Sequence, residues 1–99
     1  MHATRWAAAH AAELGANPMR VAIAGDSAGA NMAAVTALRV RCEGGPPLCG
    51  QLLLYSVTDY HTSGTPSYQD NAEGYGLTRD TMKWFWDHYL NDASEAAHP

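Results

Sequence analysis

The pattern of hydrophobic and polar residues predicts helix, strand, helix, strand and helix in that order along the chain. Apolar residues recur at helical spacing from about residue 3 to 14. Two short apolar runs without alternation, Val21–Ala24 and Gln51–Tyr55, are typical of strands buried in a parallel sheet. Between them, residues from about 28 to 42 are apolar on nearly every side, which predicts a buried helix. The two strands and the helix between them therefore predict one β-α-β crossover with parallel strands.

The chain changes character after the second predicted strand. Residues 56–76 are rich in glycine and small polar residues, which predicts a long loop that is either functional or flexible. Thr78 is expected to cap a final helix with Asp80 in its first turn. One face of that helix carries an apolar stripe at helical spacing, for which core packing is expected. The stripe consists of Met82, Phe85, Trp86 and Tyr89. The tail from residue 91 lacks periodicity, and we expect residues 1–99 to form a single domain.

The junction between the first predicted strand and the next helix reads Gly25-Asp26-Ser27-Ala28-Gly29. A Gly-x-Ser-x-Gly element between a strand and a helix is the context of a nucleophile elbow. Ser27 is therefore expected at the tip of a sharp turn, with positive φ and its Oγ clear of the sheet. The two glycines are expected to permit a close approach of strand and helix. The Ala28 N–H should point toward a tetrahedral oxyanion, and Asp26 should brace the turn or the helix N-terminus.

Composition and charge narrow the range of functions. Hydrophobic residues make up 46% of the chain and charged residues 16%, as expected of a soluble, cytoplasmic protein. A net charge of −4 without a basic stripe argues against a nucleic-acid partner. No apolar run is long enough to span a bilayer. Cys42 and Cys49 do not form a CxxC pair and have no nearby histidine cluster, so we expect no metal site. Two free thiols are expected rather than a disulfide across the short loop. No cofactor is expected.

These motifs together resemble the bacterial hormone-sensitive-lipase-like carboxylesterases and lipases of the α/β-hydrolase fold. The resemblance rests on the Gly-Asp-Ser-Ala-Gly element and the Trp84-Phe85-Trp86 helix, and it covers nearly the whole chain. Further matching segments are Trp6, Glu13-Leu14-Gly15, Arg20-Val21, Leu53-Leu54-Tyr55, Thr58-Asp59, Asn71, Gly76-Leu77-Thr78 and Tyr89-Leu90. Two positions depart from the family: Ala30 replaces a usual glycine, and Ser56 follows the tyrosine where proline is common.

The resemblance implies a partial α/β-hydrolase fold, a β-α-β unit of parallel strands with flanking helices. It implies hydrolysis of small-molecule carboxylic esters through a serine acyl-enzyme. Ser27 is the expected catalytic nucleophile, and the backbone N–H of Ala28 is one expected oxyanion donor. The elbow itself does not separate an esterase from a thioesterase, amidase or lyase on the same fold. The resemblance also places the aromatic helix near the substrate entrance, where this helix could shape an acyl pocket.

Length suggests that the chain is an internal fragment of such an enzyme. A complete α/β-hydrolase domain takes roughly 200 residues or more, and its acid and histidine follow the serine on later strand ends. The His-Gly-Gly-Gly oxyanion loop is expected upstream of this chain, and the catalytic acid and histidine downstream. Asp59 and His98 have the right order for an internal triad, but Asp59 is more simply a turn cap and His98 a tail residue.

Two further expectations follow from the fragment hypothesis. Two parallel strands leave sheet edges open, which favours self-association through a strand edge. The alternative from a different class is a non-catalytic product, either a truncated reading frame or a binding module that retained the hydrolase β-α-β core.

Overall fold

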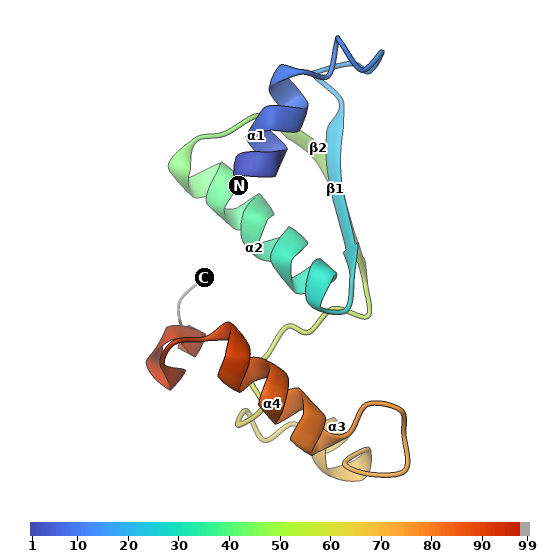
Figure 1. The fold of residues 1–99 in the computed structure, drawn as a ribbon, viewed down its shortest axis with the longest axis vertical. Coiled ribbons are helices and arrows are strands. Elements are labelled where there is room, and N and C mark those ends of the chain that lie inside the picture. The colour runs from blue at the N-terminus through green and yellow to red at the C-terminus, as the bar shows by residue number, and fades with distance from the viewer. Residues whose placement is uncertain (98–99) are drawn as a thin grey trace. The chain divides into compact units, whose positions relative to one another are not determined.

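The computed structural model describes residues 1–97, which divide into two compact units, residues 1–58 and residues 59–97. The first unit contains α1 (His2–Ala9), β1 (Val21–Asp26), α2 (Ala28–Glu43) and β2 (Leu48–Leu54), as Figure 1 shows. The second unit contains α3 (Pro66–Asp70), α4 (Arg79–Tyr89) and a 3₁₀ helix, η1 (Ala93–Ala97). Among the described residues, no helix has both the length and the apolar character needed to cross a bilayer.

The first unit confirms the predicted β-α-β arrangement. β1 and β2 pair in parallel, with Ala24 opposite Leu52 and Asp26 opposite Leu54. Both strands pack against α2, which lies along the pair in Figure 1. β1 is two residues longer than predicted, and β2 begins at Leu48 and ends before Tyr55. Backbone pairing causes these differences, because the ladder continues through residues whose side chains are small or polar.

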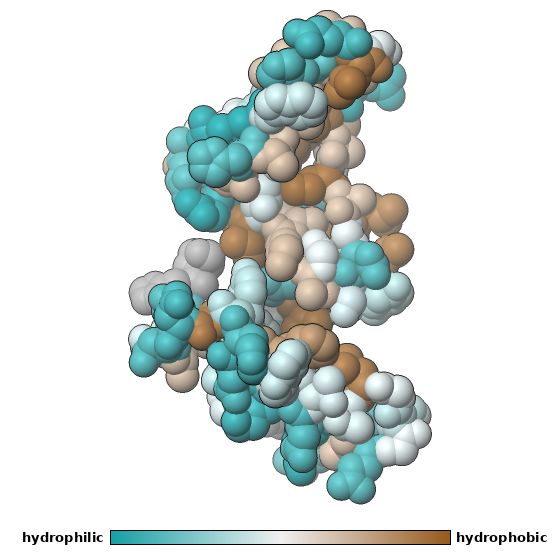
Figure 2. Space-filling view, viewed as in Figure 1, coloured by the Kyte–Doolittle hydropathy of each residue, from teal (hydrophilic) through white to brown (hydrophobic). Residues whose placement is uncertain are grey.

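The described core is small and consists of one buried residue in the turn after α1 and three buried residues of α2. They are Ala11, Ala30, Ala33 and Val40. The prediction that both strands are buried is wrong for this part of the chain, because Leu52 is 59% and Leu54 46% exposed. α2 is expected to have protein on more than one side, and the described residues supply this only in part, since Met32 and Leu38 remain about half exposed. Hydrophobic patches are accordingly visible on the surface in Figure 2.

The first helix is shorter than its hydrophobic pattern predicts. α1 ends at Ala9, and residues 10–14 continue as turns. At this end the Trp6 carbonyl accepts the His10 backbone N–H at 3.0 Å and lies 2.9 Å from the His10 ring Nδ1. The next amide, of Ala11, turns to the carbonyl of Ala8 three residues back. Such tightening is typical of a fraying helix end.

The second unit contains helices that the sequence analysis assigned to loop and tail. α3 lies inside the predicted loop, where Pro66 occupies the first helical turn and Thr65 before it is extended. Proline is preorganised for that position because its φ is fixed near the helical value. η1 lies in the predicted tail, preceded by Asp92, whose carboxylate accepts the Ser94 N–H at 2.8 Å. Hydrogen bonding from the Ser94 side chain and from its backbone N–H lowers the pKa of the Asp92 carboxyl.

α4 confirms the predicted final helix and its cap. The Thr78 Oγ1 accepts the Thr81 N–H at 3.2 Å, as expected for an N-cap threonine. Of the apolar stripe, Met82 and Trp86 are half-buried, and the Tyr60 ring meets Trp86 edge-on at 5.4 Å. The expected core packing is wrong for the other half, because Phe85 and Tyr89 are 52% and 51% exposed.

Candidate active site

Ser27 lies between β1 and α2 in the backbone conformation that the elbow motif predicts. Its φ is 52° and its ψ is −120°, which confirms the expected positive φ. A left-handed conformation at a non-glycine residue costs about 1–3 kcal/mol and persists only where its surroundings enforce it. Here the Ser27 N–H donates to the Leu54 carbonyl at 3.0 Å, and the Ser27 carbonyl accepts the amides of Ala30 and Asn31. The turn is therefore held by both β2 and α2.

Among the described residues, the Ser27 hydroxyl and the Ala28 N–H have no hydrogen-bond partner. The Ser27 side chain is half-buried, and within residues 1–97 it makes no capping hydrogen bond to α2. Ala28 is the first residue of α2, so its N–H belongs to the amides that an α-helix leaves unpaired. The positive end of the helix macrodipole also lies here and favours negative charge. The arrangement offers a hydroxyl and an amide donor at the same turn.

The two glycines of the motif have different roles. A Cβ on Gly25 would collide with the carbonyl group of Gly29 and lie 2.7 Å from the Ala30 nitrogen. This confirms the close approach of strand and helix expected at Gly25. The same expectation is wrong for Gly29, because a Cβ there would meet nothing within 4 Å. At the crossing of β1 and α2, therefore, only Gly25 lacks space for a side chain.

Asp26 is expected to brace either the turn or the N-terminus of α2, and the described residues show no contact of the second kind. Its side chain is exposed, and its Oδ2 lies 3.5 Å from the hydroxyl of Tyr55. Tyr55 directly follows β2, so this long contact joins the carboxyl ends of the two strands. Within the described residues no amide of α2 donates to the Asp26 carboxylate.

Asn31 is a structural contact of the site that sequence reasoning missed. Its Nδ2 donates to the Val57 carbonyl at 2.7 Å, in a partly buried position. The bond fixes the first turn of α2 to the segment that leaves β2. The sequence did contain a signal, because an amide side chain one helical turn after Ser27 interrupts an otherwise apolar face.

The structure does not assemble a triad within the described residues. Asp59 lies in the second unit, where its Oδ1 accepts the N–H of Tyr60 at 2.8 Å. This local bond agrees with a turn cap. His98 lies outside the described residues. Cys42 and Cys49 are free and exposed, as predicted. Within residues 1–97, no group of three His, Cys, Asp or Glu could hold a metal ion.

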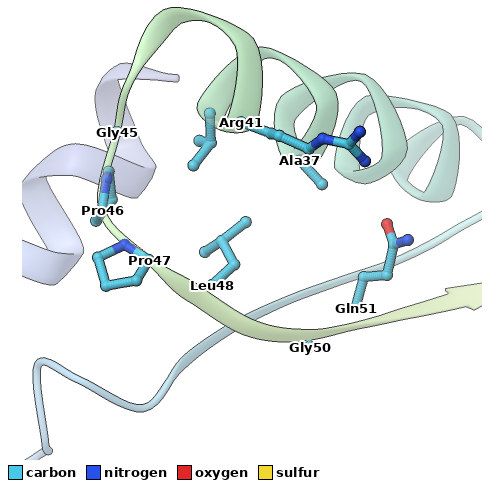
Figure 3. Close-up of a pocket in the computed structure, with 9 residues that line it drawn as sticks. Ala37, Arg41, Gly45, Pro46, Pro47, Leu48, Gly50 and Gln51 are labelled. Atoms are coloured by element: carbon cyan, nitrogen blue, oxygen red, sulfur yellow. The ribbon is translucent and has the colours of Figure 1, made fainter.

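A groove of about 440 Å³ lies in the first unit, away from Ser27. It is bounded by the last turns of α2, including Val40 and Arg41, and by the start of β2 at Leu48 (Figure 3). Because Ser27 precedes the first turn of α2, the groove and the serine lie at opposite ends of that helix. The groove is therefore separate from the candidate active site.

Comparison with known proteins identifies the family. The family model described as alpha/beta hydrolase fold matches residues 1–99. The chain therefore belongs to the α/β-hydrolase family. Several of its relatives are named carboxylesterases or esterases, which confirms the resemblance to hormone-sensitive-lipase-like carboxylesterases.

Three of these relatives are informative. Carboxylesterase NlhH of Mycobacterium tuberculosis is 48% identical over 88 residues, which cover 89% of this chain and 27% of the relative. The crystal structure of a thermostable esterase from Pseudomonas putida matches with a TM-score of 0.88 and 49% identity, over 95% of this chain and 29% of that one. The structure of an esterase from Rhizomucor miehei matches with a TM-score of 0.88 and 40% identity, over 96% of this chain and 30% of that one. The chain thus spans less than a third of each relative's length.

Proposed function

We propose that the chain carries the nucleophile of a carboxylesterase and that Ser27 is its catalytic residue. In the proposed reaction the Ser27 Oγ attacks the ester carbonyl and loses its proton to a base. The tetrahedral oxyanion accepts a hydrogen bond from the Ala28 N–H. Its collapse leaves an acyl-enzyme and expels the alcohol, whose oxygen takes the proton from the base. Water then attacks the acyl group, and the acid leaves as Ser27 regains its proton. No cofactor takes part.

The observation that carries this proposal is the conformation of Ser27. A positive φ at a serine between a parallel strand and a helix places the hydroxyl and the Ala28 amide at one exposed turn. Gly25, Asp26 and Gly29 complete the elbow around it. Gly25 supplies the space that the turn needs, and Asp26 contacts the end of β2. We place the base and its orienting acid outside residues 1–99, because the esterase relatives are about three times as long.

The proposed substrate is a small-molecule ester. One relative, from Pseudomonas putida, is an ethyl acetate hydrolase and is 31% identical over 102 residues. Composition supports the further proposals that residues 1–99 belong to one hydrolase domain and act in the cytoplasm. The apolar groove at the far end of α2 has no role in this reaction.

A chimera tests the proposal directly. In this esterase chimera, the chain replaces the matching segment of the Mycobacterium tuberculosis carboxylesterase. We expect it to hydrolyse a short-chain activated ester, and Ser27→Ala to lower turnover by a factor of about 10⁶. Ser63→Ala is the matched control, since that exposed serine lies in the second unit, and it should leave turnover unchanged. A folded chimera whose hydrolysis survives Ser27→Ala would refute the assignment.

We also propose that the 99-residue chain associates with itself through a strand edge. β1 and β2 pair only with each other among the described residues, and their apolar side chains stay accessible. An open edge with apolar neighbours is a template for pairing with another strand. Sedimentation should show dimers or larger species and a broad thermal transition. A monodisperse monomer with a sharp two-state transition would contradict this proposal.

A further inference from the structure

We propose that Tyr55 is a positioning residue for Ser27 and acts through the backbone at the end of β2. Among the non-glycine residues that the structure describes, positive φ occurs at Ser27, with 52°, and at Tyr55, with 37°. These residues directly follow the two parallel strands, whose last residues, Asp26 and Leu54, are paired. Two strained residues therefore lie side by side at the carboxyl edge of the sheet.

One hydrogen bond joins the two strained positions. The Ser27 N–H belongs to the peptide group that precedes the Ser27 Cα, and it donates to the Leu54 carbonyl at 3.0 Å. That carbonyl belongs to the peptide group that precedes the Tyr55 Cα. Because a peptide group is planar, the torsions at Leu54 and Tyr55 set the direction in which this oxygen points. The φ of Tyr55 therefore helps to orient the acceptor that holds Ser27.

Packing does not explain why a tyrosine adopts this conformation. Tyr55 is 76% exposed, and its hydroxyl contact with Asp26 is long, at 3.5 Å. The course of the following segment supplies the reason. The Ser56 Oγ is buried without a partner among the described residues, and the Val57 carbonyl is bound by Asn31 of α2. The chain must leave β2 and return to α2 within three residues while the Leu54 carbonyl still faces Ser27. A left-handed residue at position 55 makes that turn.

This mechanism predicts which side chains position 55 accepts. Glycine and asparagine adopt positive φ readily, whereas a β-branched residue in that conformation is a genuine outlier. The ring and hydroxyl of tyrosine should matter little. The importance of the inference for catalysis rests on the proposed function, because the group held in place is the proposed nucleophile.

The test is residue-resolved amide hydrogen exchange of the 99-residue chain, read at Ser27. Tyr55→Val should accelerate exchange of the Ser27 amide about tenfold, because the bond to Leu54 opens more often. Tyr55→Gly, Tyr55→Asn and Tyr55→Phe should leave that exchange rate within about twofold of the unsubstituted chain. Tyr75→Val is the matched control, since Tyr75 is also exposed, at 63%, but has no positive φ, and it should change nothing at Ser27.

Three results would overturn the inference. They are an unprotected Ser27 amide in the unsubstituted chain, an unchanged rate in a folded Tyr55→Val variant, and a Tyr55→Gly variant that exchanges about tenfold faster at Ser27. If Tyr55→Val does not fold, the glycine and phenylalanine variants decide, because a side-chain role predicts loss of protection with glycine and a backbone role does not. Failure of the proposed function would appear instead as Ser27-independent hydrolysis by the esterase chimera, which amide exchange does not measure.

Discussion

The turn at Ser27 has the contacts that hold its backbone within the first unit, whereas helix α4 leaves part of its apolar face without contacts among the described residues. At the turn, two features inside the first unit accommodate the strained backbone. The Leu54 carbonyl accepts the Ser27 N–H, and Gly25 leaves room for the start of α2. On α4 the cap at Thr78 is satisfied, yet half of the apolar stripe is exposed and the Trp86 Nε1 is buried without a partner in the described residues. Backbone geometry is thus fixed by neighbouring residues, whereas burial of an apolar face requires surfaces from elsewhere.

The largest expected effect is on the rate of ester hydrolysis, because the geometry of the turn alone should not make Ser27 reactive. The purified 99-residue chain should hydrolyse a short-chain activated ester about 10⁶-fold more slowly than the esterase chimera. The physical reason is that no described contact supplies a base to the Ser27 hydroxyl, so it remains an ordinary alcohol. Initial rates at equal chain concentration measure the difference. Ser27-dependent turnover at the rate of the chimera would contradict it, and His98→Ala would then identify the internal base.

The two glycines of the elbow offer a matched pair of substitutions. Gly25→Ala should destabilise the chain by about 1–3 kcal/mol, because its methyl group collides with backbone atoms of α2. Gly29→Ala should instead stabilise by about 0.5–1 kcal/mol, because it fills open space at a helical position. Urea unfolding of both variants measures the contrast. Equal destabilisation by the two would show that the close approach is not confined to Gly25.

How much the sequence could predict differs between these regions. The parallel β-α-β order and the conformation of Ser27 follow from short-range patterns, and both are confirmed. α3 was missed because Pro66 was interpreted as a loop residue, although it also suits a first helical turn. The prediction for Gly29 is wrong because the motif does not reveal which of its two glycines lies at the close approach. The polar Asn31 at the start of an apolar helix is a signal of a contact, but its hydrogen-bond partner Val57 could not be predicted, because it lies 26 residues away in sequence.

Loss of that bond should have an intermediate effect. Asn31→Ala should destabilise the first unit by about 1 kcal/mol, because a partly buried hydrogen bond to the Val57 carbonyl is removed. Asn31→Asp tests the donor alone, since a carboxylate cannot donate to a carbonyl, and it should destabilise at least as much. Urea unfolding again provides the measurement. Unchanged stability in both variants would show that the contact does not hold the segment after β2.

The smallest effect is expected from the exposed pair Lys83 and Asp87 on α4. The Lys83 Nζ donates to the Asp87 Oδ2 at 2.7 Å, and this bond lowers the pKa of the Asp87 carboxyl. A lowered pKa in the folded state stabilises the helix above the ordinary carboxyl pKa, and the benefit is lost as the pH falls through the folded value. The protection of the α4 amides, measured relative to their intrinsic exchange rate at each pH, should therefore fall slightly at acidic pH, and less so in Asp87→Asn. An identical pH response in both chains would contradict the pairing.

Covalent labelling of the esterase chimera tests the nucleophile most directly. A short-chain alkyl phosphonate with a nitrophenolate leaving group forms a stable phosphorus–oxygen bond with an activated serine. The segment from Val21 to Arg39, which trypsin releases, contains Ser27 as its one serine. Mass spectrometry should find a single adduct on this segment, absent after Ser27→Ala and retained after Ser63→Ala. An adduct that survives Ser27→Ala, or an active chimera labelled only elsewhere, would contradict the assignment of Ser27.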